Sequence, residues 1–232
     1  MVKGWNWDGF FEYLTNTYIL EGAAVTLGLT IAAMTLGVVA GCVVALMRMS
    51  PFRILSNIAY FYTWLIRGTP LLVQLIIIYT GLPQIGIKFS VLEATLIGLV
   101  MNEAAYLSEI IRSGISSVPK GQSNAARAVG MTDVQMMRYI IAPQAARIII
   151  PPLGNSVNGC LKTTSIASII SMEELLRRTQ VLIQEKFMVL ELFVVAALYY
   201  LLMTTAWDLI QRRIERHFGR GYDIKADAAE QR

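Results

Sequence analysis

Apolar residues gather in five long segments along the chain, and shorter polar stretches separate these segments. The first segment runs from about Gly22 to Met47 without a charged residue. The others cover roughly residues 54–81, 92–111, 148–170 and 188–210. About 20 apolar residues in a helix are enough to cross the ~30 Å hydrocarbon core of a membrane. The pattern therefore predicts an all-α integral membrane protein with about five transmembrane helices.

The composition supports this class of protein. Hydrophobic residues make up 55% of the 232 residues and charged residues only 16%, whereas about a quarter of the residues in a soluble domain are charged. The net charge of +4 is too small to indicate a nucleic-acid partner. The chain has one histidine, His217, and its two cysteines, Cys42 and Cys160, have no neighbour at metal-ligand spacing. We therefore expect no metal site and no nucleic acid as a partner.

The pattern divides the chain into three parts. In residues 1–19, aromatic and apolar residues recur at helical spacing, which predicts an external amphipathic helix lying in the membrane interface. Residues 20–215 form the predicted transmembrane domain. Residues 216–232 form a predicted polar cytoplasmic tail.

The distribution of Lys and Arg predicts the orientation in the membrane. With five spans, thirteen of these residues fall on one side and five on the other, and the side rich in cations is normally cytoplasmic. We therefore expect the N-terminus outside and the C-terminus in the cytoplasm. The thirteen are Arg48, Arg53, Arg112, Lys120, Arg127, Arg138, Arg147, Arg212, Arg213, Arg216, Arg220, Lys225 and Arg232, and the five are Lys3, Lys88, Arg177, Arg178 and Lys186.

The sequence "RGTP" at 67–70 interrupts the second segment. Gly68, Thr69 and Pro70 should break a helix there, and irregular backbone is tolerated at membrane depth only where it borders protein or a water-filled cavity. We favour a polar cavity bordered by Arg67. The alternative is an arginine that reaches the membrane interface.

Polar residues also lie inside the third and fourth segments. Glu109 is placed to pair with Arg112 three residues later, whereas Glu103 is deeper. Glu103 could contact an ammonium group or serve a structural hydrogen bond. Because polar groups against lipid are costly, we predict that Glu103, Asn158 and Lys162 share one polar cavity. The polar group in the fourth segment comprises Asn155, Ser156, Asn158, Lys162, Thr163, Thr164 and Ser165.

Two further patterns indicate helix contacts. Gly37 and Gly41 in the first segment form a Gly-x-x-x-Gly pair, which is typical of closely packed membrane helices. Residues 173–178, "EELLRR", predict a short external helix with pairs between Glu173 and Arg177 and between Glu174 and Arg178.

The stretch "SVPKGQSNAARAVGMT" at 117–132 is polar and basic, yet it contains a helix-forming run. It is either a solvated loop or a docking element for a cytoplasmic partner. We predict two short helices within residues 119–134, joined near Gly130.

This stretch resembles the EAA loop of the membrane subunits of type I ABC importers. After Ala125 and Ala126 come three residues, Gly130, nine residues and Ile140, with Pro143 closing the pattern. Asn124 replaces the usual Glu, and Ala142 replaces a Leu. A literal "EAA" at 103–105 lacks the glycine at the required distance and lies inside a predicted span.

The resemblance extends over nearly the whole chain. The segments "RGTPLLVQL" (67–75), "NEAAYLSEIIRSGI" (102–115), "APQAARIIIPPLGNS" (142–156) and "LKTTSIASII" (161–170) are similar to the polar amino acid permease family. "LMRMSP" and "GLPQIGI" are most similar to its cystine-type members.

The resemblance implies a type I ABC importer (MetI-like) permease fold with cytoplasmic coupling helices, and a subunit that translocates a polar amino acid such as cystine. It implies four partners: a cytoplasmic ATPase homodimer that binds ATP and Mg²⁺, a second permease subunit that is the same chain or a homologue, an extracytoplasmic amino-acid-binding protein, and membrane lipid. No cofactor is expected in this chain itself.

The resemblance also implies two groups of site residues. One group lies in a coupling loop at about 117–138, and the other lies within the spans. Thr163 stands where the family often has Asp, which argues against a strongly cationic substrate. The residues expected to couple to the ATPase are Lys120, Gly121, Gln122, Asn124, Ala125, Ala126, Arg127, Gly130 and Met131. The residues expected along the substrate path are Arg67, Thr69, Gln74, Asn102, Glu103, Asn155, Asn158, Lys162, Thr163 and Ser165.

The sequence contains no phosphate-binding G-x-x-x-x-G-K-[ST] pattern. The chain is therefore expected to be a transport subunit rather than an enzyme in its own right. An ion-coupled secondary amino acid transporter is the alternative, although we find no internal duplication of the kind that such transporters often contain. A membrane enzyme is the weakest alternative, because no metal cluster or Ser/His pair is evident.

Overall fold

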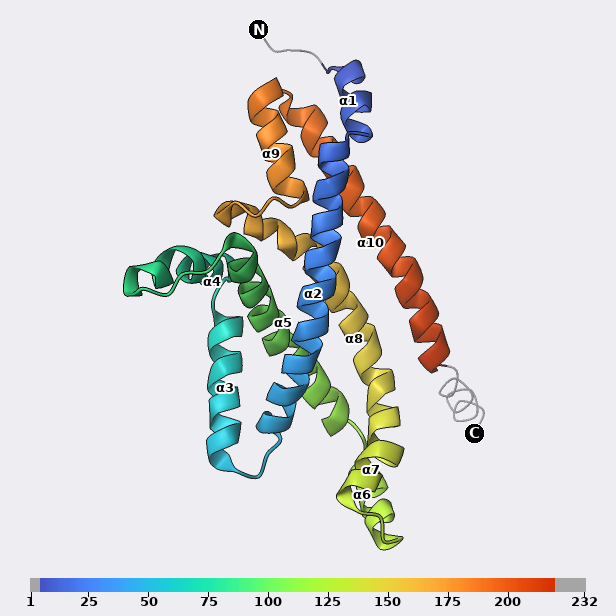
Figure 1. The fold of residues 1–232 in the computed structure, drawn as a ribbon. Helices are drawn as coiled ribbons and strands as arrows, with labels where there is room; N and C mark the ends of the chain where they lie inside the picture. Colours follow the sequence, from blue (N-terminus) through green and yellow to red (C-terminus); the bar gives the residue numbers. More distant parts are fainter. Residues whose placement is uncertain (1–4, 220–232) are drawn as a thin grey trace.

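The structure is a computed structural model that describes residues 5–219 and is almost entirely helical there (Figure 1). Short π-helices cover Ile77–Gly81 and Met137–Ile141, and 3-10 helices cover Leu82–Ile85 and Thr164–Ile170. The α-helices are α1 (Trp7–Leu14), α2 (Thr17–Arg48), α3 (Arg53–Gly68), α4 (Leu71–Ile76), α5 (Val91–Ser116), α6 (Lys120–Ala128), α7 (Asp133–Met136), α8 (Ala142–Thr163), α9 (Leu175–Lys186) and α10 (Val189–Gly219).

Each of the five predicted segments forms a helix, but the second is not one straight span. Helices α2, α5 and α10 are long and apolar enough to cross a membrane. Helices α3 and α4 together supply a fourth candidate that is bent by 103°. The bend falls at Thr69 and Pro70, where the sequence predicted a break, because proline cannot continue the hydrogen bonding of α3. The remaining helix, α8, forms the fourth of the predicted segments, and it is the most polar of the five.

Helices α2 and α5 make the most extensive contact in the fold. Two glycines allow this close approach. A Cβ atom at Gly37 would lie 2.8 Å from Glu103 Cβ, and one at Gly41 would lie 3.1 Å from Leu107 Cβ and 3.2 Å from the Ala104 carbonyl oxygen. The predicted packing role of the Gly-x-x-x-Gly pair is confirmed.

Helices α8 and α10 pack closely through a polar contact. The indole N–H of Trp207 donates to the Gly154 carbonyl at 2.8 Å. A Cβ atom at Gly154 would lie 2.5 Å from the Gln211 side chain. This contact fixes the side of α8 that faces α10, and it leaves the opposite side for α5.

The helix predicted from residues 173–178 is present as α9, but it begins at Leu175, and the ion pairs predicted within it are wrong. Glu174 lies one residue before the helix and caps it, accepting the Arg177 backbone N–H at 2.8 Å. The buried Glu174 carboxylate also accepts the Tyr200 hydroxyl of α10 at 2.9 Å. Arg178 pairs with Glu21 of α2 at 2.6 Å instead of with Glu174. The N-cap position outcompetes the i,i+4 pair because unpaired N–H groups at a helix start need an acceptor.

The two ends of the molecule are different. Helices α1 and α9 lie at one end, and α6 and α7 lie at the other (Figure 1). The predicted amphipathic helix is present as α1, with its partly buried residues packed near the start of α10. The first residues of the predicted polar tail, 216–219, form the end of α10. The rest of that tail, residues 220–232, lies outside the described part of the chain.

Candidate functional site

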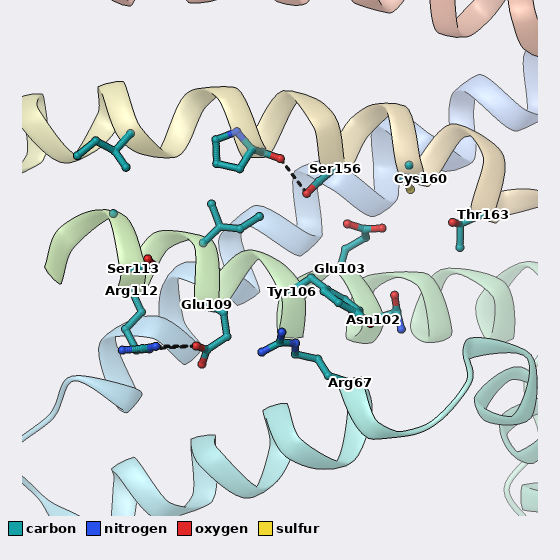
Figure 2. A pocket seen from close by; sticks show the side chains of 15 residues that line it. Arg67, Asn102, Glu103, Tyr106, Glu109, Arg112, Ser113, Ser156, Cys160 and Thr163 are labelled. Atoms are coloured by element: carbon teal, nitrogen blue, oxygen red, sulfur yellow. Dashed lines mark hydrogen bonds and ion pairs between the residues drawn. The ribbon is translucent and has the colours of Figure 1, made fainter. Parts of the chain in front are cut away.

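A cavity of about 680 Å³ lies between the end of α3, one face of α5 and one face of α8 (Figure 2). Helices α5 and α8 contribute residues at helical spacing, so that one stripe of each faces the cavity, whereas α3 contributes only Arg67. The polar and aromatic lining residues are Arg67 from α3, Asn102, Glu103, Tyr106, Glu109, Arg112 and Ser113 from α5, and Ser156, Cys160 and Thr163 from α8.

Arg67 reaches the cavity because α3 ends directly after it. Its guanidinium lies over the Tyr106 ring, 5.2 Å from the ring centroid. The buried Gln74 side chain holds the bend between α3 and α4. Its amide donates to the Ile66 carbonyl at 2.8 Å and to the Thr69 hydroxyl at 2.9 Å. These bonds satisfy polar groups that the break at Pro70 leaves without helical partners.

The charges in the cavity fall into two groups. The Glu109 carboxylate lies 3.2 Å from Arg48 and 2.8 Å from Arg112, so it is neutralised by two ion pairs. The predicted pair between Glu109 and Arg112 is confirmed. Within residues 5–219, Arg67 and Glu103 form no ion pair, and they bring opposite charges to one cavity.

Glu103 is buried, with 7% of its surface exposed, at the contact of α5 with α2. Figure 2 shows its carboxylate directed toward α8, near Cys160. Arg67 and Tyr106 lie on the α3 side of the same cavity. A ligand in this space would therefore meet a carboxylate from one side and a guanidinium from the other.

The structure divides the predicted substrate-path residues among four places. Arg67, Asn102, Glu103 and Thr163 line the cavity. Thr69 and Gln74 brace the bend between α3 and α4. Asn155 accepts from Gln211 at 3.3 Å, and Asn158 donates to Asp208 at 2.7 Å, so both face α10. Lys162 and Ser165 line a separate pocket of about 440 Å³ beside Tyr200 and Thr204 of α10.

The prediction that Glu103, Asn158 and Lys162 share one cavity is therefore wrong. Asn158 and Lys162 are four residues apart and lie on the stripe of α8 that faces α10. The cavity is lined by the neighbouring stripe of Ser156, Cys160 and Thr163. Because α8 is polar on both stripes, polarity alone did not indicate which one faces Glu103.

Six polar or aromatic residues that line the cavity were not predicted as substrate-path residues. These residues are Tyr106, Glu109, Arg112, Ser113, Ser156 and Cys160. A helical-spacing signal was available: Tyr106 and Ser113 continue the stripe that starts at Asn102, and Cys160 follows Ser156 by one turn.

The predicted pair of short helices is present as α6 and α7, and Gly130 joins them. Helix α6 ends in a Schellman motif, in which the Gly130 N–H donates to the Arg127 carbonyl at 3.0 Å and the Met131 N–H donates to the Ala126 carbonyl at 3.1 Å. Gly130 has φ = +79°, a conformation that strongly favours glycine. Helix α7 starts with a capping box formed by Thr132 and Gln135. Unlike the prediction, α7 continues through the π-helix Met137–Ile141 into α8.

Most of the predicted coupling residues are exposed at this end of the molecule. Ala126 is the exception: it is 4% exposed and packs in a cluster with Val118, Met136, Ile141 and Ala145. It holds α6 against its own chain and does not present a surface to a partner. Met131 packs against the same cluster. The exposed residues are Lys120, Gly121, Gln122, Asn124, Ala125, Arg127 and Gly130.

Two exposed apolar side chains on this unit were not predicted. Val129 is 77% exposed and Val134 is 76% exposed, on either side of Gly130. Arg127 forms an exposed ion pair with Asp133 at 3.4 Å, which links α6 to α7. The unit therefore offers small and apolar side chains with a polar rim, as expected of a docking surface.

The all-helical fold, the polar cavity between spans and the protruding helix pair define a membrane transport subunit. The family model described as "Binding-protein-dependent transport system inner membrane component" matches residues 19–220. The chain therefore belongs to this family of multi-pass inner-membrane proteins.

Curated relatives match over most of their length. The arginine transport system permease protein ArgU of Corynebacterium glutamicum is 39% identical over 94% of this chain and 74% of the relative. The probable amino-acid ABC transporter permease protein YckA of Bacillus subtilis is 37% identical over 94% of this chain and 98% of the relative. The putative glutamine transport system permease protein GlnP of Rickettsia bellii is 39% identical over 89% of this chain and 97% of the relative.

Solved structures show the same fold. A crystal structure of an amino acid ABC transporter with histidines has a TM-score of 0.87 and 37% identity, and the match covers 93% of this chain and all of that one. An inward-facing structure of the MetNI methionine ABC transporter has a TM-score of 0.73 at 17% identity, over 87% of this chain and 96% of that one. The expected MetI-like permease fold is confirmed.

Proposed function

We propose that this chain is the membrane-spanning permease subunit of an ATP-binding-cassette importer and that it translocates a polar amino acid. The observation that carries this proposal is the unit of α6 and α7, which stands out at one end of the molecule. Its glycine joint and exposed small residues fit the groove of a partner protein. Family membership and the printed names of the relatives support the same function.

In the proposed complex this chain contacts three kinds of partner subunit. A cytoplasmic ATPase homodimer binds ATP and Mg²⁺ and contacts the unit of α6 and α7. A second permease subunit, which is another copy of this chain or a homologue, completes the pathway. An extracytoplasmic amino-acid-binding protein delivers the substrate to the end formed by α1 and α9. With Asn124 in place of the motif Glu, contact with the ATPase relies on packing by Val129, Val134 and Ala125 more than on charge.

The proposed substrate path includes the cavity between α3, α5 and α8. Its charges suit a zwitterionic ligand: Arg67 can bind a carboxylate in the bidentate manner of guanidinium, and Glu103 can accept an ammonium group. Thr163 adds a hydroxyl but no second unpaired carboxylate. The resemblance to cystine-type permeases favours cystine, and relatives are named for arginine and glutamine.

The proposed orientation places the N-terminus outside and the C-terminus in the cytoplasm. Its support is the excess of Lys and Arg at the end of the molecule that carries α6 and α7.

The test is ATP-driven uptake by the assembled complex in vesicles. This chain is co-expressed with the partner ATPase and the second permease subunit, purified through a tag on the ATPase, and reconstituted with the loaded binding protein. Radiolabelled cystine, arginine and glutamine are compared side by side. We expect uptake of one of them that requires ATP and is lost in Glu103→Gln. Uptake driven by an ion gradient without ATP would instead support a secondary transporter.

A further inference from the structure

An apolar groove of about 600 Å³ runs between α2 and α10 and shares no lining residue with the Arg67 and Glu103 cavity. Helices α2 and α10 diverge here, and α8 forms the floor between them (Figure 1). Its lining residues carry no charge. They are Leu27, Thr30, Ile31, Met34 and Thr35 of α2, Val157 and Leu161 of α8, and Leu202, Met203, Ala206, Trp207 and Ile210 of α10.

Both walls of the groove belong to helices that are long and apolar enough to span a membrane. The rims are open: Ile31 is 66% exposed and Leu202 is also 66% exposed. A groove of this kind within a bilayer is filled by apolar matter, because water would find almost no polar partner there.

One end of the groove leads to positive charge. Helix α10 continues without interruption to Gly219. On this helix Arg213 and His217 follow Ala206 and Ile210 at spacings of three and four residues, so they continue the stripe that lines the groove. Both side chains are exposed.

The acidic residues of this part of α10 lie on other sides of the helix. Asp208 is bound to Asn158 of α8, and Glu215 accepts from Gln211. The stripe that continues the groove is therefore cationic and carries no carboxylate from α10.

The distance along the helix fits a lipid. Leu202 and Arg213 are separated by eleven residues, which corresponds to about 16 Å in an α-helix. Half of the ~30 Å hydrocarbon core of a bilayer is about 15 Å. An acyl chain lying against Leu202, Ala206 and Ile210 would therefore place its headgroup at the level of Arg213.

We propose that this groove binds one acyl chain of an anionic phospholipid and that Arg213 and His217 bind its phosphate. Guanidinium is well suited to phosphate because its fork of N–H groups matches two phosphate oxygens. In the proposed orientation this lipid belongs to the cytoplasmic leaflet, where anionic lipids attract basic residues. The bound chain fills the space between α2 and α10 and holds both helices in place on α8.

Photolabelling of the intact complex tests this site. The purified complex is placed in phosphatidylcholine nanodiscs that contain a trace of either phosphatidylglycerol or phosphatidylcholine with a diazirine in the middle of its acyl chain. After illumination, the labelled peptides are identified by mass spectrometry. We expect label on residues 202–210 of α10 and 27–35 of α2, with the phosphatidylglycerol probe several times more efficient than the phosphatidylcholine probe.

Four variants separate the parts of the site. Ala206→Phe fills the groove and should reduce labelling by both probes, with Ile210→Phe as a second filling variant. Arg213→Gln should reduce labelling by phosphatidylglycerol about fivefold, the factor for one cation near an anionic surface, and leave phosphatidylcholine unchanged. Arg212→Gln is the matched control, because Arg212 lies on another side of α10, and it should change neither. Copurification of the ATPase shows that each variant is assembled.

Three results would overturn the proposal. Equal labelling of the groove by the two probes would show ordinary boundary lipid. Equal effects of Arg212→Gln and Arg213→Gln would show a diffuse attraction rather than a site. Absence of lipid label, together with cross-linking of a cysteine at 206 to the second permease subunit, would show that a protein helix fills the groove.

Discussion

The guanidinium of Arg48 lies 3.2 Å from the carboxylate of Glu109, and this pair joins the last residue of α2 to α5. Both side chains are largely buried, with 17% and 19% exposed. Arg112 binds the other oxygen of the same carboxylate at 2.8 Å. One carboxylate therefore holds two cations at the edge of the cavity.

Replacing Glu109 should weaken this junction more than replacing Arg112 does. Glu109→Gln leaves Arg48 and Arg112 close together without a counter-charge, and we expect a loss of about 2 kcal/mol, between the values for surface and buried pairs. Arg112→Gln, at a more exposed position, should cost less than about 1 kcal/mol. Thermal unfolding of the complex in detergent measures both. Equal shifts in Tm would contradict this arrangement.

The joint between α6 and α7 should depend on the positive φ of Gly130. Gly130→Asn should keep most of the coupling, because asparagine tolerates this conformation, whereas Gly130→Val should lose most of it through strain of about 1–2 kcal/mol. Gly130→Asp tests charge at the same surface and should abolish uptake. The readout is ATPase stimulation by the loaded binding protein, together with uptake. Gly28→Ala is the control, since Gly28 lies within α2, outside the unit of α6 and α7, with open space around it.

Helices α2 and α5 should separate when their glycine contact is filled. Gly41→Val introduces a Cβ only 3.1–3.3 Å from side-chain and backbone atoms of α5. We expect a loss of about 1–3 kcal/mol, as for other overpacked contacts. Gly28→Val in the same helix faces open space and should change stability by less than about 0.5 kcal/mol. A larger Tm shift for Gly28→Val than for Gly41→Val would rule out this packing.

Thiol labelling should distinguish the two stripes of α8. In a background without native cysteines, cysteine at Ser156 or Thr163 should react with a small water-soluble maleimide in at least one transport state. Cysteine at Asn158 should react much more slowly, because that position faces Asp208 of α10. Fast labelling at 158 with protection at 156 would reverse the assignment of the cavity face.

The sequence was informative wherever a local rule sets the structure. Pro70 ends a helix, Gly130 needs a left-handed conformation, and Gly37 with Gly41 allows two helices to touch; all three could be predicted from residue type and spacing. The five apolar segments could also be predicted from the sequence, because the thickness of the membrane sets the length of a span.

The rest depended on tertiary contacts. Whether Lys162 or Ser156 faces Glu103 is set by how α8 is rotated, and both stripes of α8 are polar. Ala126 looked suited to a partner surface, but it is buried because the cluster around Met136 requires a small residue there. The pair of Arg48 and Glu109 joins residues far apart in sequence, which no periodic pattern indicates.

The π-helix at Met137–Ile141 determines the angular phase of α8. A π-turn adds one residue to a helical turn, and each residue advances a helix by about 100°. The capping box fixes the start of α7. The single extra residue that follows it therefore determines which face of α8 is turned toward Glu103. Deleting one residue there would restore a regular α-helix. Helix α8 would then be rotated about its axis by roughly 100° relative to α6 and α7. Ser156 and Thr163 would no longer face the cavity. Every side chain from Ala142 to Thr163 would point in a different direction around the helix axis.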